Sequence, residues 1–478
     1  MTVNSQLSRR GLLIGSLGAL HAQTAFRQSI AGSVILPNDA EYDSARRVFS
    51  FNPRTDKHPQ MIVQCGAPED AAKAVSYARE RGLDVAVRSG GHDLLGASVC
   101  DGMVIDLSRM KAIRLNRETG TVLAEAGVRA GELNGSTQAA GLAVPLGCHP
   151  AVGVAGLTLG GGLGWLIGKH GATCDHLLGA GVVTADGKVL HASANENPDL
   201  FWALRGGGGN FGIVTALEYQ ARPVDQVTGG VIAYRTPLDR YLRFYSGFMN
   251  DAPPELAVEL NILLNHPPTI VAMVCWSGGA SDGARALRAL RAFGPPEKDL
   301  VDTVGYLHLL DRFPQLGSLL GPPPPRGRQG PPSIYWRGGS LRGLSHATAD
   351  RFAAIAQGAP PGSSIGIGHY MHGQVCRVAH DATPLPRVSG QLTYFINGSW
   401  YEVAKAETSM AWVDRSWTAM KRYSGEGAYI NYLSSDGPAA VKASYGANYA
   451  RLAQLKRKYD PTNFFHHNRN ILPSALGG

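Results

Sequence analysis

The sequence lacks the features that mark several large classes of protein. No stretch reaches the roughly 18 uninterrupted apolar residues that a membrane-spanning helix needs, and there is no long Lys/Arg run or nucleic-acid-binding motif. The six cysteines contain no CxxC pair, which argues against a zinc site or a dense disulfide framework. We therefore predict no membrane span, no nucleic-acid partner and no metal. The cysteines are Cys65, Cys100, Cys148, Cys174, Cys275 and Cys376.

Glycine, in contrast, is abundant. There are 60 glycines in 478 residues, which implies many tight turns or close approaches of backbone to backbone or to a ligand. The chain is too long for one ordinary core, so we expect two domains or one domain with a large insertion. The formal net charge of +8 favours solubility and small anionic ligands. We expect a monomer or a homodimer.

The N-terminus contains a candidate export signal. Arg9 and Arg10 precede an apolar segment that ends near Leu20, as in a twin-arginine leader. We predict export by this route, with a cytoplasmic protein carrying two chance arginines as the alternative. Residues 1–35 are expected to be a leader or disordered and to lie outside the fold.

The segment 88–93, with the sequence RSGGHD, is the first candidate ligand site. It follows a β-α-β pattern formed by a strand at 61–65, a helix from Pro68 to Gly82 and a strand at 83–87. Bare glycine amides after a buried strand form a nest for a pyrophosphate. His92 would then have a short tether to whatever the phosphates carry, so we interpret the segment as a flavin cradle with a covalent histidine. A glycine-rich turn with a structural histidine is the alternative.

Two more glycine-rich segments follow. Residues 145–165 combine glycines with Leu, Val and Trp, which favours backbone pressed against a large flat ligand over a flexible linker. The glycines at 207, 209 and 212 satisfy GxGxxG, but a helix at 200–205 precedes them and a strand at 213–218 follows. This order is the reverse of a Rossmann dinucleotide site. Strands at 103–107 and 121–126, a helix at 129–141 and a hairpin of 179–184 with 188–192 complete the predicted N-terminal region.

From about residue 224 the pattern favours an antiparallel sheet covered by helices. Predicted strands lie at 229–234, 256–264, 269–276, 364–370, 374–378 and 391–397, with helices at 282–293 and 402–420 and a proline-rich loop at 321–332. The tail is expected to add a strand at 428–432 and a helix at 444–458.

Four motifs together resemble the berberine-bridge-enzyme-like flavoproteins of the vanillyl-alcohol-oxidase superfamily. They are RSGGHD, GVAGLTLGGGLGW, NPDLFWALRGGGGNFGIVT and the closing YINY…YGANYARL…KYDPTNFFHHNRNI, in the family's order from about residue 54 to 475. The resemblance implies an α+β fold. It would consist of a PCMH-type FAD-binding domain of two α+β subdomains at 54–223, a substrate domain at 224–420 and a C-terminal segment at 421–478 that returns to the flavin.

The resemblance also implies the cofactor site. His92 would carry the 8α-methyl of FAD, and Ile213 and Val214 would contact its adenine half. Asn468 and Asn470 would approach from the tail. The cradle and the wall of the site would comprise Arg88, Ser89, Gly90, Gly91, Asp93, Ser98, Val152, Gly153, Gly156, Leu157, Gly160, Gly161, Gly162 and Gly164.

Members with a second flavin bond place a cysteine four residues before the position of Gly153. That place is occupied here by His149, and Cys148 lies one residue too early. A slipped loop would be needed to bring Cys148 to the flavin, so we predict a single bond through His92, with a packed thiol at Cys148.

The implied reaction is oxidation of a small molecule. A hydride would leave an alcohol, hemiacetal or amine carbon for flavin N5 while Tyr432 accepts a proton, supported by Tyr429. Plain strand alternation puts these two tyrosines on opposite faces, which conflicts with a shared role. Small residues at 154–156 would leave room for O2, so we expect an oxidase that releases H2O2. The alternatives are a dehydrogenase or cyclase of secondary metabolism and a flavin-binding protein without turnover.

Overall fold

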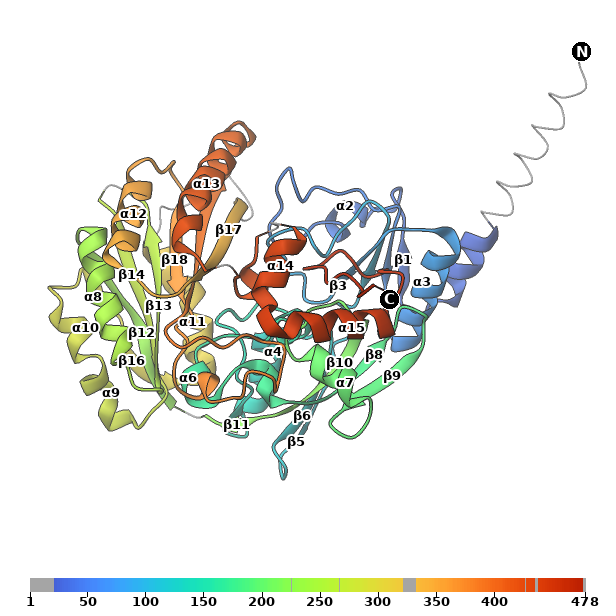
Figure 1. Ribbon diagram of the computed structural model, residues 1–478, viewed down its shortest axis with the longest axis horizontal. Helices are drawn as coiled ribbons and strands as arrows, with labels where there is room; N and C mark the ends of the chain where they lie inside the picture. The colour runs from blue at the N-terminus through green and yellow to red at the C-terminus, as the bar shows by residue number, and fades with distance from the viewer. Residues whose placement is uncertain are drawn as a thin grey trace, which may run out of the picture.

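The computed structural model describes residues 21–475 except 225, 266, 321–331, 426, 435 and 436. Figure 1 shows an N-terminal domain beside a middle domain built on one large sheet, with the C-terminal helices lying against the N-terminal domain. The main core of the N-terminal domain runs from Phe26 to Ala221 and then takes in residues from Ile430 to Ile471. The two ends of the chain therefore share one core.

The first sheet of the N-terminal domain positions the segment 88–93. Strands β2 and β3 both run parallel to β4 in the order β1-β2-β4-β3, and α3 connects β2 to β3, so the predicted β-α-β pattern is confirmed. Gly82 ends α3 in the left-handed conformation, with φ of 61°. Strand β3 stops at Arg88, which places the RSGGHD loop at the carboxyl edge of the sheet. The bounds are β1 Ser33–Ile35, β2 Met61–Gln64, α3 Pro68–Arg81, β3 Val85–Arg88 and β4 Met103–Asp106.

The second sheet is antiparallel, with the order β5-β6-β10-β8-β9. Its central strand β10 begins directly after the third glycine-rich segment. The predicted hairpin is confirmed, since β8 and β9 pair across a turn in which Gly187 has φ of 79°. The bounds are β5 Ile113–Asn116, β6 Thr121–Glu125, α4 Ala130–Gln138, β8 Leu177–Val183, β9 Val189–Ser193, α7 Pro198–Leu204 and β10 Ile213–Gln220.

The expectation that residues 1–35 lie outside the fold is wrong for 21–35. Residues 21–29 are helical, and Phe26 stacks on Tyr77 with ring centroids 4.0 Å apart. Strand β1 pairs with β2, and Ile30 and Val34 are buried. These apolar side chains cover the edge of the first sheet. The twin-arginine segment lies outside the described residues.

The middle domain is an antiparallel sheet with a different partner on each face. The strand order is β15-β12-β14-β13-β18-β19-β17, with β16 also pairing with β12. Helices α8, α12 and α13 cover the outer face (Figure 1), where they share one core with the sheet. Helix α11 packs on the other face of β12 and also contacts α4 of the N-terminal domain. No helix among the described residues is both long and apolar enough to cross a bilayer.

Several predicted elements of this half are confirmed and others are not. Strands β12, β13, β14, β18 and β19 and helix α13 form where expected. Helices α8, α11 and α12 and strand β17 are not among the predicted elements. The proline-rich loop lies almost wholly in 321–331, outside the described residues. The bounds are β12 Gln226–Arg235, α8 Leu238–Asn250, β13 Leu256–Leu263, β14 Thr269–Trp276, β15 Lys298–Asp299, β16 Asp302–Gly305, α11 Tyr306–Leu320, β17 Ser333–Leu341, α12 His346–Gln357, β18 Ser364–Gly368, β19 Leu392–Trp400 and α13 Ala406–Met420.

Four predictions fail at local breaks in the chain. The predicted helix at 282–293 is two helices, α9 and α10, which meet at Leu287, and the side chains of Leu287 and Leu290 are both buried. The segment 374–378 is not a strand, because its first residues belong to a 3-10 turn. The segment 428–432 is not a strand either, because its last three residues form another 3-10 turn. The helix at 444–458 is interrupted at Gly446, whose φ is 52°. The bounds are α9 Ala280–Ala286, α10 Arg288–Ala292, η2 Gly373–Cys376, η5 Ile430–Tyr432, α14 Pro438–Tyr445 and α15 Tyr449–Tyr459.

A buried ion pair fixes the tail to the third glycine-rich segment. The Lys456 ammonium donates to Asp460 at 2.7 Å and to the carbonyls of Asn210 at 2.9 Å and Phe465 at 2.8 Å. The Asp460 carboxylate accepts in turn from the backbone amides of Phe464 and Phe465. Both side chains of the pair are fully buried. Every charge here is hydrogen-bonded, so loss of either partner leaves an uncompensated buried charge.

We expect Lys456→Met to lower the free energy of unfolding by about 3–5 kcal/mol, since it leaves the Asp460 carboxylate buried without its cation. The matched control is Lys458→Met on the same helix. Lys458 pairs with Asp199 at the surface and is 59% exposed, so its loss should cost at most about 1 kcal/mol. Urea unfolding followed by tryptophan fluorescence measures both, and equal losses in the two variants would contradict the assigned role of Lys456.

Candidate functional site

A cavity of about 650 Å³ lies between the three glycine-rich segments and the large sheet. The N-terminal domain contributes glycines and larger residues of the three glycine-rich segments to its wall, and the middle domain contributes residues of β13, β18 and β19. The C-terminal tail completes the wall with residues 429–432, 465 and 467–469. The residues that line the cavity extend from the RSGGHD loop to the start of β10.

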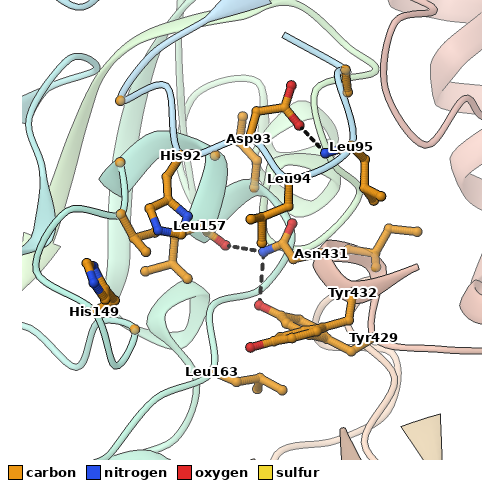
Figure 2. A pocket seen from close by; sticks show the side chains of 18 of the residues that line it. His92, Asp93, Leu94, Leu95, His149, Leu157, Leu163, Tyr429, Asn431 and Tyr432 are labelled. Carbon is orange, nitrogen blue, oxygen red and sulfur yellow. Dashed lines mark hydrogen bonds between the residues drawn. The ribbon is translucent and has the colours of Figure 1, made fainter. Parts of the chain in front are cut away.

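The loop after β3 is held in shape by one carboxylate. Asp93 accepts a hydrogen bond from the backbone amide of Leu95 at 2.9 Å (Figure 2). It also accepts from the backbone amides of Gly96 at 3.0 Å and Ser98 at 2.7 Å and from the Ser98 hydroxyl at 2.7 Å. Residues 89–95 and 97–98 all line the cavity. Asp93 therefore shapes a cradle, and its own oxygens are occupied by the loop.

Arg88 does not reach the cavity. Its guanidinium donates to the Asp106 carboxylate at 2.8 Å, and both side chains are buried. The predicted direct contact between Arg88 and the cofactor phosphates is therefore absent from this arrangement. Arg88 instead ties the ends of the neighbouring strands β3 and β4 together.

Two glycines bring the first and second glycine-rich segments into backbone contact. A Cβ atom on Gly90 would lie 2.3 Å from the Cα of Gly153, and a Cβ on Gly153 would lie 2.7 Å from the Cα of Gly90. Any side chain at either position would push the loops apart. The bare backbone surfaces that result fit a flat, phosphate-bearing group such as FAD.

The predicted residues of the second segment divide into two sets. Val152 and Gly153 line the cavity just before helix α5 (Val154–Leu159), and Gly156 and Leu157 line it within that helix. The glycines that follow lie behind the wall and make room for other parts of the protein. A Cβ would come within 2.1 Å of Asn431 at Gly160, 2.7 Å of Leu385 at Gly161, 2.2 Å of Thr173 at Gly162 and 1.9 Å of the Leu146 carbonyl at Gly164.

His92 projects into the cavity from the first loop (Figure 2). Its ring stacks on Phe49 with centroids 4.1 Å apart, and His149 lies on another side at 5.4 Å. Burial, helped by the nearby charge of His149, lowers the pKa of His92 to about 4. The imidazole is therefore neutral at physiological pH, and a ring nitrogen has a lone pair available for bonding.

Tyr429 and Tyr432 lie together, contrary to the expectation from strand alternation. The 3-10 turn rotates the chain so that their rings are 5.7 Å apart. The Tyr429 hydroxyl accepts a hydrogen bond from Asn431 at 2.9 Å (Figure 2) and another from the Gly162 amide at 3.1 Å. Burial raises the pKa of both phenols, and the charge of Glu259 further raises that of Tyr432.

The tail closes the cavity near the third glycine-rich segment, where Ile213 and Val214 also line it. Asn468 donates to the Gly209 carbonyl at 3.0 Å and lines the cavity, whereas Asn470 does not. The sequence motifs did not point to Arg469, a partly buried residue that also lines the cavity. Among the described residues, its Nε and the Asn468 Oδ1 are buried without a hydrogen-bond partner. These orphaned polar atoms fit a polar cofactor in the cavity.

The opposite wall carries a polar cluster that the sequence did not reveal. The Cys148 thiol donates to Glu259 at 2.9 Å and lies 3.6 Å from His369 Nε2. Burial, with the charge of Glu259, raises the pKa of Cys148 well above its ordinary value. Cys148 therefore faces side chains of the middle domain, and neither Glu259 nor His369 lies in a motif that would have identified it.

Comparison with known proteins shows the same architecture. The family described as FAD binding domain matches residues 59–193, and the family described as berberine and berberine like matches residues 428–472. (R)-6-hydroxynicotine oxidase of Paenarthrobacter nicotinovorans is 30% identical, over 94% of this chain and 98% of that protein. An uncharacterized FAD-linked oxidoreductase of Bacillus subtilis (strain 168) is 29% identical, over 94% and 98%. The solved structure of 6-hydroxy-D-nicotine oxidase from Arthrobacter nicotinovorans is 28% identical, with a TM-score of 0.84 over 93% of this chain and 98% of that chain.

We expect Gly90→Ala to remove bound flavin, since its Cβ would overlap Gly153 and open the cradle. The ratio of flavin to protein absorbance in the purified protein measures this loss. Gly247→Ala in α8 is the matched control, because a Cβ there has no atom within 4 Å and alanine favours a helix. A Gly90→Ala protein that folds and retains full flavin content would contradict the role of this contact.

Proposed function

The chain belongs to the berberine-bridge-enzyme-like FAD-linked oxidoreductases, and we propose that it is an oxidase that carries its FAD on His92. The predicted α+β fold and enzyme class are confirmed by the same comparisons. The observation that carries the proposal is the cavity itself. His92 and the bare backbone of the glycine-rich loops form one end, and Tyr429, Asn431 and Tyr432 lie across from them (Figure 2).

The cavity offers a place for each part of FAD. The backbone amides of the loop at 89–98 and the Arg469 guanidinium would hold the phosphates, and Ile213 and Val214 would contact the adenine half. When bound, FAD supplies the redox chemistry, taking a hydride from an alcohol, hemiacetal or amine carbon at N5 and passing two electrons to O2 to give H2O2. The chain has to bind the cofactor, orient the substrate and accept the proton that the substrate loses.

We propose one covalent bond to the cofactor, through His92. The neutral imidazole and its position beside the loop cradle support this assignment. His149 occupies the place at which relatives with a second bond are expected to carry cysteine, and the Cys148 thiol is engaged with Glu259. A second bond through Cys148 would have to break that contact.

We propose that Tyr432 receives the proton that leaves the substrate heteroatom. Tyr432 lines the cavity, and Tyr429, held by Asn431 and Gly162, lies beside it. The raised pKa of Tyr432 means that the phenol is protonated at rest. It can therefore act only if a positive charge in the loaded site favours the phenolate or if its own proton moves on as it accepts another.

We further propose that the protein is exported by the twin-arginine route, on the strength of Arg9 and Arg10 ahead of an apolar segment. Such a route suits a protein that folds around its cofactor before transport. Fractionation of a host expressing the full chain, compared with an Arg9→Lys, Arg10→Lys double variant, tests the assignment.

The bond to His92 is tested by acid precipitation followed by peptide mass spectrometry. We expect a yellow wild-type pellet with FAD mass on the peptide that contains His92, and a colourless pellet from His92→Ala. Cys148→Ser should leave the pellet yellow. A wild-type pellet without colour, after expression with ample riboflavin, would refute the covalent link.

For Tyr432→Phe we expect retention of bound flavin and a fall of about 10²–10⁴-fold in the rate of flavin reduction, the range for loss of a proton-transfer group. A panel of primary alcohols, reducing sugars and cyclic amines, screened by H2O2 release, first identifies a working substrate. Anaerobic stopped-flow absorbance then measures reduction. Tyr459→Phe is the control, because that phenol bonds Asp199 outside the cavity. Unchanged reduction in Tyr432→Phe would remove Tyr432 from the mechanism, and reduction without H2O2 would indicate a dehydrogenase.

A further inference from the structure

The middle-domain side of the cavity brings three metal-ligating atoms together. Cys148 Sγ lies 2.9 Å from Glu259 Oε1 and 3.6 Å from His369 Nε2, and Glu259 Oε1 lies 3.4 Å from His369 Nε2. The ligands come from three separate segments: the second glycine-rich loop, strand β13 and the residue after β18. All three residues line the cavity.

We propose that Cys148, Glu259 and His369 bind one Zn²⁺ ion, whose fourth coordination position faces the cavity and takes an oxygen donor of the substrate. The substrate part of this inference rests on the proposed oxidase function. The metal site itself stands on the geometry of the three side chains.

The spacing of the three atoms matches a tetrahedral site. Zinc lies about 2.3 Å from thiolate sulfur and about 2.0–2.2 Å from imidazole nitrogen or carboxylate oxygen, which sets ligand atoms roughly 3.3–3.6 Å apart. Two of the three separations already have these values. The Cys148–Glu259 distance is shorter because a thiol proton joins the two atoms, and it would lengthen when the metal replaces that proton.

His369 is held in the orientation that a metal ligand needs. Its Nδ1 lies 3.0 Å from the Thr393 hydroxyl, which donates to the Gly368 carbonyl at 3.1 Å. The Nδ1 atom can therefore carry the proton and leave the Nε2 lone pair free for the metal. His369 also has φ of 48°, a left-handed conformation that is uncommon for non-glycine residues and persists only where the surrounding structure holds it.

The charges balance when the metal binds. A Cys148 thiolate and a Glu259 carboxylate carry two negative charges, and the neutral His369 ring adds none. The side chains of Glu259 and His369 are only 15% and 6% exposed. A divalent cation would neutralise both anions in a place where unpaired charge is costly, and binding would release one proton from the thiol to solvent.

Three protein ligands with an open fourth position are typical of catalytic zinc. The open position would lie on the cavity side, near Tyr432, whose ring centroid is 5.5 Å from that of His369. A substrate hydroxyl or carbonyl oxygen bound there would be oriented and polarised. The site therefore favours alcohols, hemiacetals or hydroxy acids over substrates without an oxygen donor.

Zinc content of the holoenzyme tests the site without turnover. The full chain is purified without a polyhistidine tag, incubated with ZnCl2 and desalted. We expect about one zinc per chain, and zinc K-edge absorption showing one sulfur among its ligands. Cys148→Ser should lose the sulfur signal and, with Glu259→Gln, most of the metal.

A second cluster on the surface supplies the matched control. Asp84 faces His466 and His467 in an exposed group that could also retain a cation. His466→Ala removes a ligand there and should leave one zinc with a sulfur ligand in place. Far-ultraviolet circular dichroism and flavin content confirm that each variant is folded.

Thr393→Val gives a second measurement that does not depend on a lost ligand. Removing the partner of a ligating histidine should weaken zinc binding by about 10- to 100-fold, measured by competition with a chromogenic chelator. A merely structural Thr393 would leave the zinc affinity unchanged.

Three results would overturn the proposal: no zinc retained by wild type, zinc without sulfur that leaves on His466→Ala, or FAD found bonded to Cys148. Each is distinct from failure of the oxidase assignment. A yellow enzyme that produces H2O2 but binds no zinc would disprove only the metal site, and a colourless pellet with one bound zinc would disprove only the covalent flavin.

Discussion

The contact between the backbones of Gly90 and Gly153 is the constraint on which the site depends. Two loops from different sheets meet there with no side chain between them. Their amides and the ring of His92 consequently face one space, and Asp93 keeps the first loop in the curvature that this requires. Because one methyl group on either glycine would separate the loops, the cradle does not tolerate any larger residue at these two positions.

The tail supplies the second constraint. The Lys456–Asp460 pair holds the end of α15 against the carbonyl of Asn210, which brings Arg469 and Asn468 to the cavity. Lys456 and Asn210, which are 246 positions apart, are thereby fixed to each other by an interaction that excludes water. The same tail places Tyr429 and Tyr432 across from His92. A cofactor bound in the cavity would thus contact the N-terminal domain and the C-terminal tail at once, and its binding would stabilise both.

The site could be predicted from the sequence where its residues are consecutive in the chain. The segments around His92, Gly153 and Ile213 were identified because glycine-rich backbone and strand periodicity are local signals, and they do line one cavity. Prediction failed where the outcome depends on packing. Arg88 was expected at the phosphates, but the strand neighbour Asp106 takes its charge. The turn at Tyr432 could not be read from alternation, since a 3-10 turn places both phenols on one side. Strand β1 could not be predicted, because no pattern in residues 21–35 indicates that their apolar side chains pack at the edge of a sheet.

The division of the cavity explains why the cofactor could be inferred from the sequence and the substrate could not. One wall comes from the three glycine-rich segments of the N-terminal domain, whose residues form continuous motifs. The other wall is made of single side chains from separate strands of the large sheet, such as Glu259 and His369, which have no spacing rule between them. The absence of CxxC pairs argued against zinc, yet that argument applies only to ligands that are near one another in sequence. The proposed site is not covered by that argument, because its ligands come from β13, the residue after β18 and a loop of the other domain. Exchange of single residues on these strands can therefore change the substrate, while the glycine-rich wall on the side of the N-terminal domain stays unchanged.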